Sequence, residues 1–493
     1  MTGVWCGDFL RLFYLFRLMN SVAKTIKSGL LWSGLAQFII QIIKVGRWII
    51  LLYLISPESY GLFSLAVIVV GIPQTLIDQG VGSALVQSDK NFTSTDLSTY
   101  FWTLTSYGLL LLFGSFFFAD YIAHFFSEPE LASLIILLSG AFLVESVGKV
   151  SHGLLRKRLM FKYLAQVETV SFVIATFITV AFAYMEYGTK SLVYGLFSEY
   201  LLTMVFHVRG AGFHLRLVYS IASIKKIYVF FRNIGLIHFI TSLMRYTDDL
   251  LIGFFYGKAA LGVYDRAYLI VHLPMRLVTN KIIMVLFPAY SQKRMHPEEI
   301  RESHLKILHY SSVFYFFILG AIILLAKPAV VTTLPEKWHD LAFFIPILAV
   351  GGVIHAFINY NYSIFLSFDR TDLQLKYGIF TRGIIMVSYI TGAFFGVKGI
   401  AIGYVVGSFI AFFPESMRAW QEIGLTLSDY IYSVKKVFII SLGIFLLSFA
   451  SLSMLQNSLH RLFLGGLVYI SAYFVLYRRE IFSFGRNILG TVR

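Results

Sequence analysis

The sequence predicts an all-α polytopic membrane protein of about fourteen transmembrane helices. We expect two pseudo-symmetric six-helix bundles around a central cavity, followed by two additional C-terminal helices. Hydrophobic residues make up 58% of the 493 residues, charged residues make up 14%, and the mean hydropathy is +0.75. Long apolar runs recur along the chain without the alternation of barrel strands, and the second half of the sequence resembles the first.

The expected elements follow in order. The first bundle has spans at 29–55, 60–87, 98–119, 131–151, 163–185 and 188–206. The second has spans at 233–256, 260–290, 307–326, 341–367, 376–396 and 399–417, and the additional helices are 434–454 and 462–477. The predicted domains are an N-terminal cytoplasmic or interfacial segment (1–22), the first bundle (23–208), a cytoplasmic amphipathic linker (209–232), the second bundle (233–417), a cytoplasmic linker (418–433), the two additional helices (434–478) and a cytoplasmic tail (479–493).

Basic residues predict the orientation. With a cytoplasmic N-terminus, the alternate loops on the far side hold only Lys190, Lys258, Lys327, Lys337, Lys398 and Arg461. The net charge of +15 therefore reflects topology and contact with anionic lipid headgroups, and leaves little support for nucleic-acid binding. Both termini are expected in the cytoplasm.

The N-terminal residues do not read as a cleavable signal peptide, because Arg11 and Arg17 interrupt the apolar stretch. Either translation starts at Met19, or residues 8–20 form an interfacial amphipathic segment. The single cysteine, Cys6, excludes an intrachain disulfide framework. We find no phosphate-binding loop and no His/Cys/Asp spacing typical of a metal site, so no cofactor or metal is expected.

The internal repeat appears at a shift of 201 residues, where Gly34 matches Gly235 and Pro73 matches Pro274. Later the shift becomes 208, and Gly188 matches Gly396. Six spans in each half make a parallel repeat, the plan of transporters that open a shared cavity to either side. The paired prolines are either hinges for that motion or static bends that shape the cavity.

Charged residues within the apolar spans are costly unless they face water or a partner. Lys44 and Arg245 occupy equivalent mid-span positions in the repeat. Each ends a polar stripe with the spacing i, i+4, i+7, which places its members on one helical face. The stripes are Gln37, Gln41 and Lys44, and His238, Ser242 and Arg245. They predict a basic site for an anion; the alternative is structural ion pairing, for example of Arg245 with Asp248 or Asp249.

Arg276 and Arg382 add further cations to the predicted cavity. A guanidinium donates two parallel hydrogen bonds, which suits a pyrophosphate, whereas such a cavity suits a cationic drug poorly. Membrane-embedded acids are candidates for coupling to H⁺ or Na⁺, or else are hydrogen-bonded structural groups. These acids are Asp78, Glu145, Glu199, Asp248 and Asp249. His238 and His272 are weaker candidates for a proton role.

Several motifs resemble those of a known family. They are PESYGLFSLAVIVVGIPQTLIDQGVGSALVQ (Pro57–Gln87), LRKRLMFKYLAQVE (Leu155–Glu168), DDLLIG (Asp248–Gly253), ALGVY (Ala260–Tyr264) and LFPA (Leu286–Ala289). In these motifs the chain resembles the Wzx-type polysaccharide flippases of the multidrug/oligosaccharidyl-lipid/polysaccharide exporter superfamily. The resemblance implies a bacterial inner-membrane protein that carries undecaprenyl-pyrophosphate-linked oligosaccharide, for O-antigen, capsule or exopolysaccharide assembly, by alternating access through a cationic cavity.

Two other functions remain open at this point. An ion-coupled multidrug exporter of the same superfamily would have a site dominated by acids. A membrane-embedded glycan polymerase or ligase would need a catalytic periplasmic loop, and the longest such connections, about 119–131 and 327–341, are short. We therefore expect a transporter and no enzyme activity, with lipid-linked oligosaccharide, membrane lipid and other polysaccharide-assembly proteins as partners.

Overall fold

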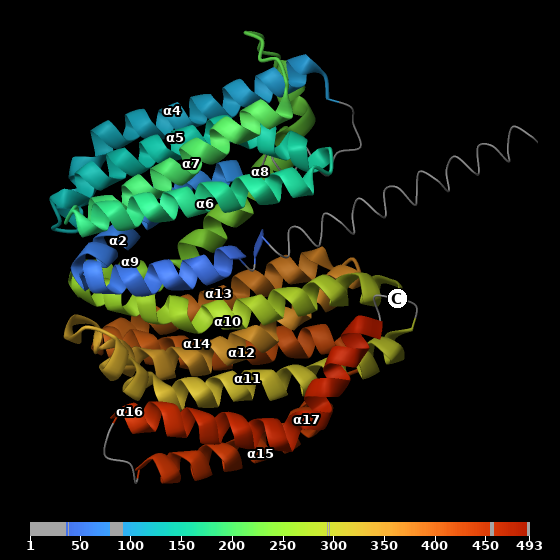
Figure 1. The fold of residues 1–493 in the computed structure, drawn as a ribbon. Coiled ribbons are helices and arrows are strands. Elements are labelled where there is room, and N and C mark those ends of the chain that lie inside the picture. Colours follow the sequence, from blue (N-terminus) through green and yellow to red (C-terminus); the bar gives the residue numbers. More distant parts are fainter. Residues whose placement is uncertain are drawn as a thin grey trace, which may run out of the picture. The chain divides into compact units, whose positions relative to one another are not determined.

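The computed structural model describes residues 36–78 except 38, 92–453 except 293 and 295, and 458–490 (Figure 1). Throughout these ranges the regular structure is helical and no strand occurs, which confirms the predicted fold class. The predicted segment 1–22, the choice between Met1 and Met19, and the motif end at 79–87 lie outside the described residues.

Nine helical segments within the described ranges are long and apolar enough to cross a membrane. They are Ser94–Phe125, Glu130–Lys157, Phe161–Tyr184, Thr189–Ala211, Gly257–Gln292, Pro297–Thr333, Glu336–Ser367, Gly396–Gln421 and Leu427–Leu452. The chain is therefore a multi-pass membrane protein. It divides into two compact units, Met1–Leu243 and Met244–Arg493.

The first unit is built around α5 (Glu130–Lys157). This helix packs against α2 (Pro57–Asp78), α4 (Ser94–Phe125) and α7 (Thr189–Ala211). The helix α6 (Phe161–Tyr184) packs mainly against α7. The helix α8 (Ile221–Arg245) comes after α7 in the chain. A further helical stretch covers residues 39–54. Because α5 has neighbours on several sides, more of its apolar residues are buried than those of α4 or α6.

Local sequence explains where two of these helices begin. Thr93 accepts a hydrogen bond from the backbone amide of Asp96, and the Asp96 carboxylate accepts one from the Thr93 amide, which forms a capping box before α4. Gly188 precedes α7 with φ +53°, a left-handed conformation that glycine adopts without a steric penalty. The short turn at Gly188 makes α6 and α7 antiparallel neighbours.

The second unit repeats this arrangement around α12 (Leu341–Ser367). This helix packs against α10 (Gly257–Gln292), α11 (Pro297–Thr333) and α14 (Gly396–Gln421), the counterparts in chain order of α2, α4 and α7. The helix α13 (Thr371–Ala393) packs against α14 as α6 packs against α7. Gly396, the repeat match of Gly188, also has positive φ, at +84°, so the two matched glycines make matching turns.

Small residues allow α13 and α14 to approach closely. Gly399, Gly403 and Gly407 recur every four residues along one face of α14. A Cβ atom at Gly399 would overlap the carbonyl group of Gly392, and one at Gly403 would overlap the carbonyl oxygen of Ser388. Glycine is therefore required at these positions by the packing of the hairpin.

Two C-terminal helices, α15 (Leu427–Ser453) and α17 (Gly466–Gly490), pack against α11. A row of buried tyrosines on α17 makes the connection. The Tyr469 hydroxyl donates to the carbonyl of Phe317 at 3.0 Å, and the Tyr473 hydroxyl donates to that of Val313 at 2.7 Å. Tyr477 donates to the carbonyl of Val437 on α15 at 3.0 Å. Because the phenol rings also fill the apolar interface, these helices are anchored by both packing and hydrogen bonds.

Several helices extend beyond the predicted spans, as α11 does beyond 307–326, and three further differences concern a break or an end. The predicted span 233–256 is divided into α8 and α9 (Thr247–Phe255), with the interruption at Tyr246. The predicted span 462–477 begins inside a π-helical turn, Arg461–Gly465, which follows the short α16 (Ser458–His460). The last helix, α17, continues to Gly490, well into the expected tail. Hydropathy marks apolar length, so it does not detect a break within an apolar run or a polar continuation of a helix.

Candidate functional site

A group of arginines forms the first candidate site, in the second unit. Arg245 ends α8, Arg276 lies in α10 and Arg382 lies in α13, and all three side chains are exposed. Arg382 is within electrostatic range of Arg245, and both Arg245 and Arg276 are within range of Tyr268. The structure therefore places Arg245 and Arg382 within range of each other, and Arg276 within range of the same tyrosine as Arg245. Guanidinium groups interact with carboxylates and phosphates through two parallel hydrogen bonds, so these residues are candidates for an anion site.

Two of these guanidinium groups are held by local contacts. The Arg245 guanidinium carbon lies 4.7 Å from the ring centroid of Tyr246, and Arg382 donates to the carbonyl of Gly378 at 3.0 Å. Tyr246 is also the residue at which the helix is interrupted. Asp248 and Asp249 therefore belong to α9, and Asp249 lies within electrostatic range of Arg245, so the alternative of ion pairing stays open.

Buried polar and aromatic groups lie beside the arginines. The His272 ring stacks on Tyr268 with centroids 3.9 Å apart, and its Nε2 hydrogen-bonds the Tyr404 hydroxyl at 3.1 Å. The hydroxyl of Tyr264 donates to Asp248 at 3.0 Å. These contacts give His272 and Asp248 a structural role in packing α9, α10 and α14.

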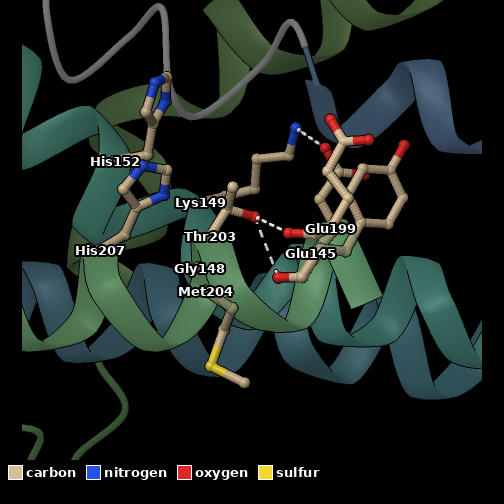
Figure 2. A pocket seen from close by; sticks show the side chains of 9 residues that line it. Glu145, Gly148, Lys149, His152, Glu199, Thr203, Met204 and His207 are labelled. Carbon is tan, nitrogen blue, oxygen red and sulfur yellow. Dashed lines mark hydrogen bonds and ion pairs between the residues drawn. The ribbon is translucent and has the colours of Figure 1, made fainter. Parts of the chain in front are cut away.

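A cavity in the first unit forms the second candidate site (Figure 2). It has a volume of about 170 Å³ and lies between α5 and α7. Glu145, Gly148, Lys149, His152, Glu199, Tyr200, Thr203, Met204 and His207 line it. Gly148 packs directly on Met204, and this close approach joins the two helices next to the polar lining.

Glu145 and Lys149 form an ion pair in this cavity at 2.6 Å, and the Gln74 amide donates to the other oxygen of Glu145. Glu199 faces the same cavity from α7. Two predicted coupling acids thus come from different helices to one cavity. Lys44 and Arg47 lie within electrostatic range of Glu199. They lie 5.4 Å and 4.7 Å from the Phe172 ring centroid, which places this part of the 39–54 helix beside α6.

Two histidines that the sequence analysis did not single out also line the cavity. The rings of His152 and His207 have centroids 5.0 Å apart and an interplanar angle of 40°. The sequence did contain the spacing that places each histidine on the polar face of its helix. On α5 the spacing i, i+4, i+7 relates Glu145, Lys149 and His152. On α7 the spacing i, i+4, i+8 relates Glu199, Thr203 and His207. What the sequence did not contain was the pairing of these two helical faces.

Residues 50–343 match the family described as "Polysaccharide biosynthesis protein". The chain belongs to this polysaccharide biosynthesis family. It is 26% identical to the teichuronic acid biosynthesis protein TuaB of Bacillus subtilis (strain 168), over 87% of this chain and 90% of TuaB. It is 24% identical to the lipopolysaccharide biosynthesis protein WzxC of Escherichia coli (strain K12), over 88% of each chain.

Solved structures establish the fold of this polysaccharide biosynthesis protein. The lipid II flippase MurJ in an inward closed conformation superposes with a TM-score of 0.71 at 18% identity, over 91% of this chain and 99% of MurJ. An inward-facing MATE multidrug transporter of the MOP superfamily superposes with a TM-score of 0.61 at 16% identity, over 78% and 96% of the two chains. The predicted resemblance to Wzx-type proteins is confirmed by the family match and by the likeness to WzxC, and the solved structures confirm the fold.

The remaining predicted site residues of this protein differ in burial. Gln37 is exposed, Gln41 is half-buried, His238 is half-buried and Ser242 is buried. Lys44 lies in the first unit and Arg245 in the second, so the predicted opposition of the two stripes stays a prediction. Asp78 ends α2, and its side chain lies outside the described residues.

The two prolines of the predicted hinge pair both lie within long helices, Pro73 in α2 and Pro274 in α10. The Tyr107 hydroxyl of α4 donates to the Pro73 carbonyl at 3.0 Å, so the backbone at this proline is connected to a neighbouring helix. Whether the prolines act as hinges stays a prediction.

Proposed function

We propose that this protein is a flippase that moves undecaprenyl-pyrophosphate-linked oligosaccharide repeat units across the bacterial inner membrane for surface polysaccharide assembly. Membership of the polysaccharide biosynthesis family supports the pathway. The fold shared with a lipid II flippase supports translocation of a lipid-linked cargo. Relatives named for teichuronic acid, lipopolysaccharide and succinoglycan biosynthesis support a surface glycan as the product.

The observation that carries the proposal is the group formed by Arg245, Arg276 and Arg382. Like charges in one neighbourhood repel each other, and the carboxylates within range, Asp249 and Glu415, offset part of that repulsion. A pyrophosphate group offsets that repulsion and accepts paired hydrogen bonds from guanidinium groups. Lys44 is the proposed fourth cation of the cavity.

Alternating access of two bundles is the proposed mechanism, with both termini in the cytoplasm. The superfamily also contains multidrug transporters, but a cationic drug would be repelled by three neighbouring arginines. We propose that an H⁺ or Na⁺ gradient, removal of the cargo on the periplasmic side, or both, supplies the driving force. Membrane lipid and other polysaccharide-assembly proteins are the proposed partners.

Complementation tests this function. A strain that lacks its own glycan flippase is expected to regain surface polysaccharide when it expresses this chain. Lipid-linked intermediate should then shift from the cytoplasmic to the periplasmic face of the membrane, measured by its accessibility to an externally added glycosidase in spheroplasts. Intermediate that remains on the cytoplasmic face, in cells whose membranes contain the protein, would contradict the proposal.

A further inference from the structure

The α5–α7 cavity has an ordered internal arrangement that the anion site does not use. Figure 2 shows its polar side chains at three levels along the two helices. Glu145 and Glu199 form the first level, Lys149 and Thr203 the second, and the two histidines the third. At ~1.5 Å per residue, the histidines lie roughly 10 to 12 Å beyond the glutamates, toward the C-terminal ends of both helices.

The two glutamates differ in their partners. Glu145 is neutralised by Lys149 and receives a hydrogen bond from Gln74. The Glu199 carboxylate is half-buried and makes no hydrogen bond or ion pair with any side chain in the described part of the chain. A carboxylate in a membrane-embedded cavity without a direct partner is stabilised by water or by a bound proton. Glu199 is therefore the acid of this cavity that is available to exchange a proton.

The histidine pair lies at the other end of the cavity. His207 is only 7% exposed, and its Nε2 atom has no hydrogen-bond partner among the described residues. A neutral imidazole carries one donor and one acceptor nitrogen, so it can receive a proton at one nitrogen and release one from the other. The cavity, which has a volume of about 170 Å³ and both polar and apolar lining, has room for several water molecules between His207 and Glu199.

We infer that Glu199 is a proton-carrying carboxylate, and that the water-filled cavity ending at the His152–His207 pair is its proton path. In one half of the cycle a proton crosses from the histidine end through water and binds a Glu199 oxygen, which makes the side chain neutral. In the other half the same proton leaves and the carboxylate is restored. This inference deepens the proposed transport function and rests on it for the coupling of proton movement to cargo.

Charged and titratable groups on the neighbouring helices face this path and determine its electrostatic potential. Those on α5 are Glu145, Lys149, His152 and Arg156; on α7, His207; on the 39–54 helix, Lys44 and Arg47; and on α6, Glu168. The cations stabilise the Glu199 anion, and Glu168 opposes them. The uncharged Gln74 of α2 donates a hydrogen bond to Glu145.

Infrared difference spectroscopy of the purified full-length protein in nanodiscs tests the carboxylate without any cargo. A pH titration of the wild type is expected to show a protonated-carboxyl band that Glu199→Gln removes. Glu186→Gln, at an exposed turn before α7, is the matched control and is expected to keep the band. A band that persists in Glu199→Gln would overturn the assignment. Glu199→Asp, which keeps the acid, should retain a band at a shifted position.

Proteoliposomes that contain lipid-linked oligosaccharide test the path. Cargo movement in the wild type is expected to respond to an imposed pH difference, and Glu199→Gln should lose that response. His207→Leu should slow it, and His207→Gln, which restores a polar group, should recover part of it. An unchanged response to the pH difference in both Glu199→Gln and His207→Leu would contradict the inference. Cargo that does not move even in the wild type, while the infrared band titrates, would instead count against the flippase function.

Discussion

Arg245 of α8 and Arg382 of α13 lie within electrostatic range of each other in the second unit, although they come from distant parts of the sequence. Glu415 of α14, which accepts a hydrogen bond from Thr381 at 3.0 Å, is an acid within range of Arg382. Asp249 of α9 is a second acid of this region, within range of Arg245. The proposed function therefore requires that the three guanidinium groups outweigh these carboxylates and favour an anion.

Substitution of Arg245 tests the anion site. Arg245→Ala is expected to abolish polysaccharide export although the protein still reaches the membrane, because the variant lacks one of the guanidinium groups proposed to bind phosphate. Arg245→Lys should retain part of the export if charge matters more than bidentate geometry, and Lys44→Ala should weaken it. Surface glycan and membrane protein levels are measured together. Arg209→Ala, exposed near the end of α7, serves as the control. Normal glycan in Arg245→Ala cells would exclude this residue from the site.

The Glu145–Lys149 pair predicts a non-additive effect on stability. Both side chains are about four-fifths buried. Lys149→Met leaves Glu145 without its cation, so it should lower the thermal unfolding temperature of the purified protein. Glu145→Gln combined with Lys149→Met should recover much of the loss, since the unpaired charge is then absent. Additive losses in this double-mutant cycle would show that the pair contributes no coupling energy.

Substitution of Gly403 tests the close packing between α13 and α14. Gly403→Val places a side chain against the Ser388 carbonyl, and overpacking of this kind costs about 1 to 3 kcal/mol. The unfolding temperature and the yield from membranes should both fall. Gly443→Ala is the matched control on α15, because a Cβ atom there meets no atom within 4 Å. Equal behaviour of the two variants would refute the close approach of the hairpin.

Tyr473 predicts how firmly the C-terminal helices are attached. Tyr473→Phe removes the hydrogen bonds to Val313 and Ser441 and keeps the ring, at a cost of about 0.5 to 1.5 kcal/mol. Limited proteolysis is expected to release the α15–α17 segment more readily from this variant. Tyr432→Phe, whose side chain is largely exposed, should behave like the wild type. Equal proteolysis rates for the wild type and Tyr473→Phe would mean that packing alone anchors the segment.

Much of the candidate site was visible in the sequence as single residues. Arg245, Arg276, Arg382, Glu145 and Glu199 stood out because an ionised group in an apolar span requires an explanation. Their grouping was not visible, because it depends on how each helix is rotated about its axis. His152 and His207 lie near the ends of apolar runs where polar residues are common, so nothing distinguished them until their rings were found in contact. The break at Tyr246 lies between Arg245 and Asp248, inside a span that we predicted as one continuous helix.

The sequence by itself determined the membrane class, the helical fold and the family. Long apolar segments must satisfy their backbone hydrogen bonds internally, which is a local requirement that each segment meets as a helix. Only the tertiary structure decided which helices are neighbours and which polar faces share a cavity. Those contacts depend on close packing between distant segments, such as Gly148 on Met204 and Gly403 on Ser388, and no single segment contains that information.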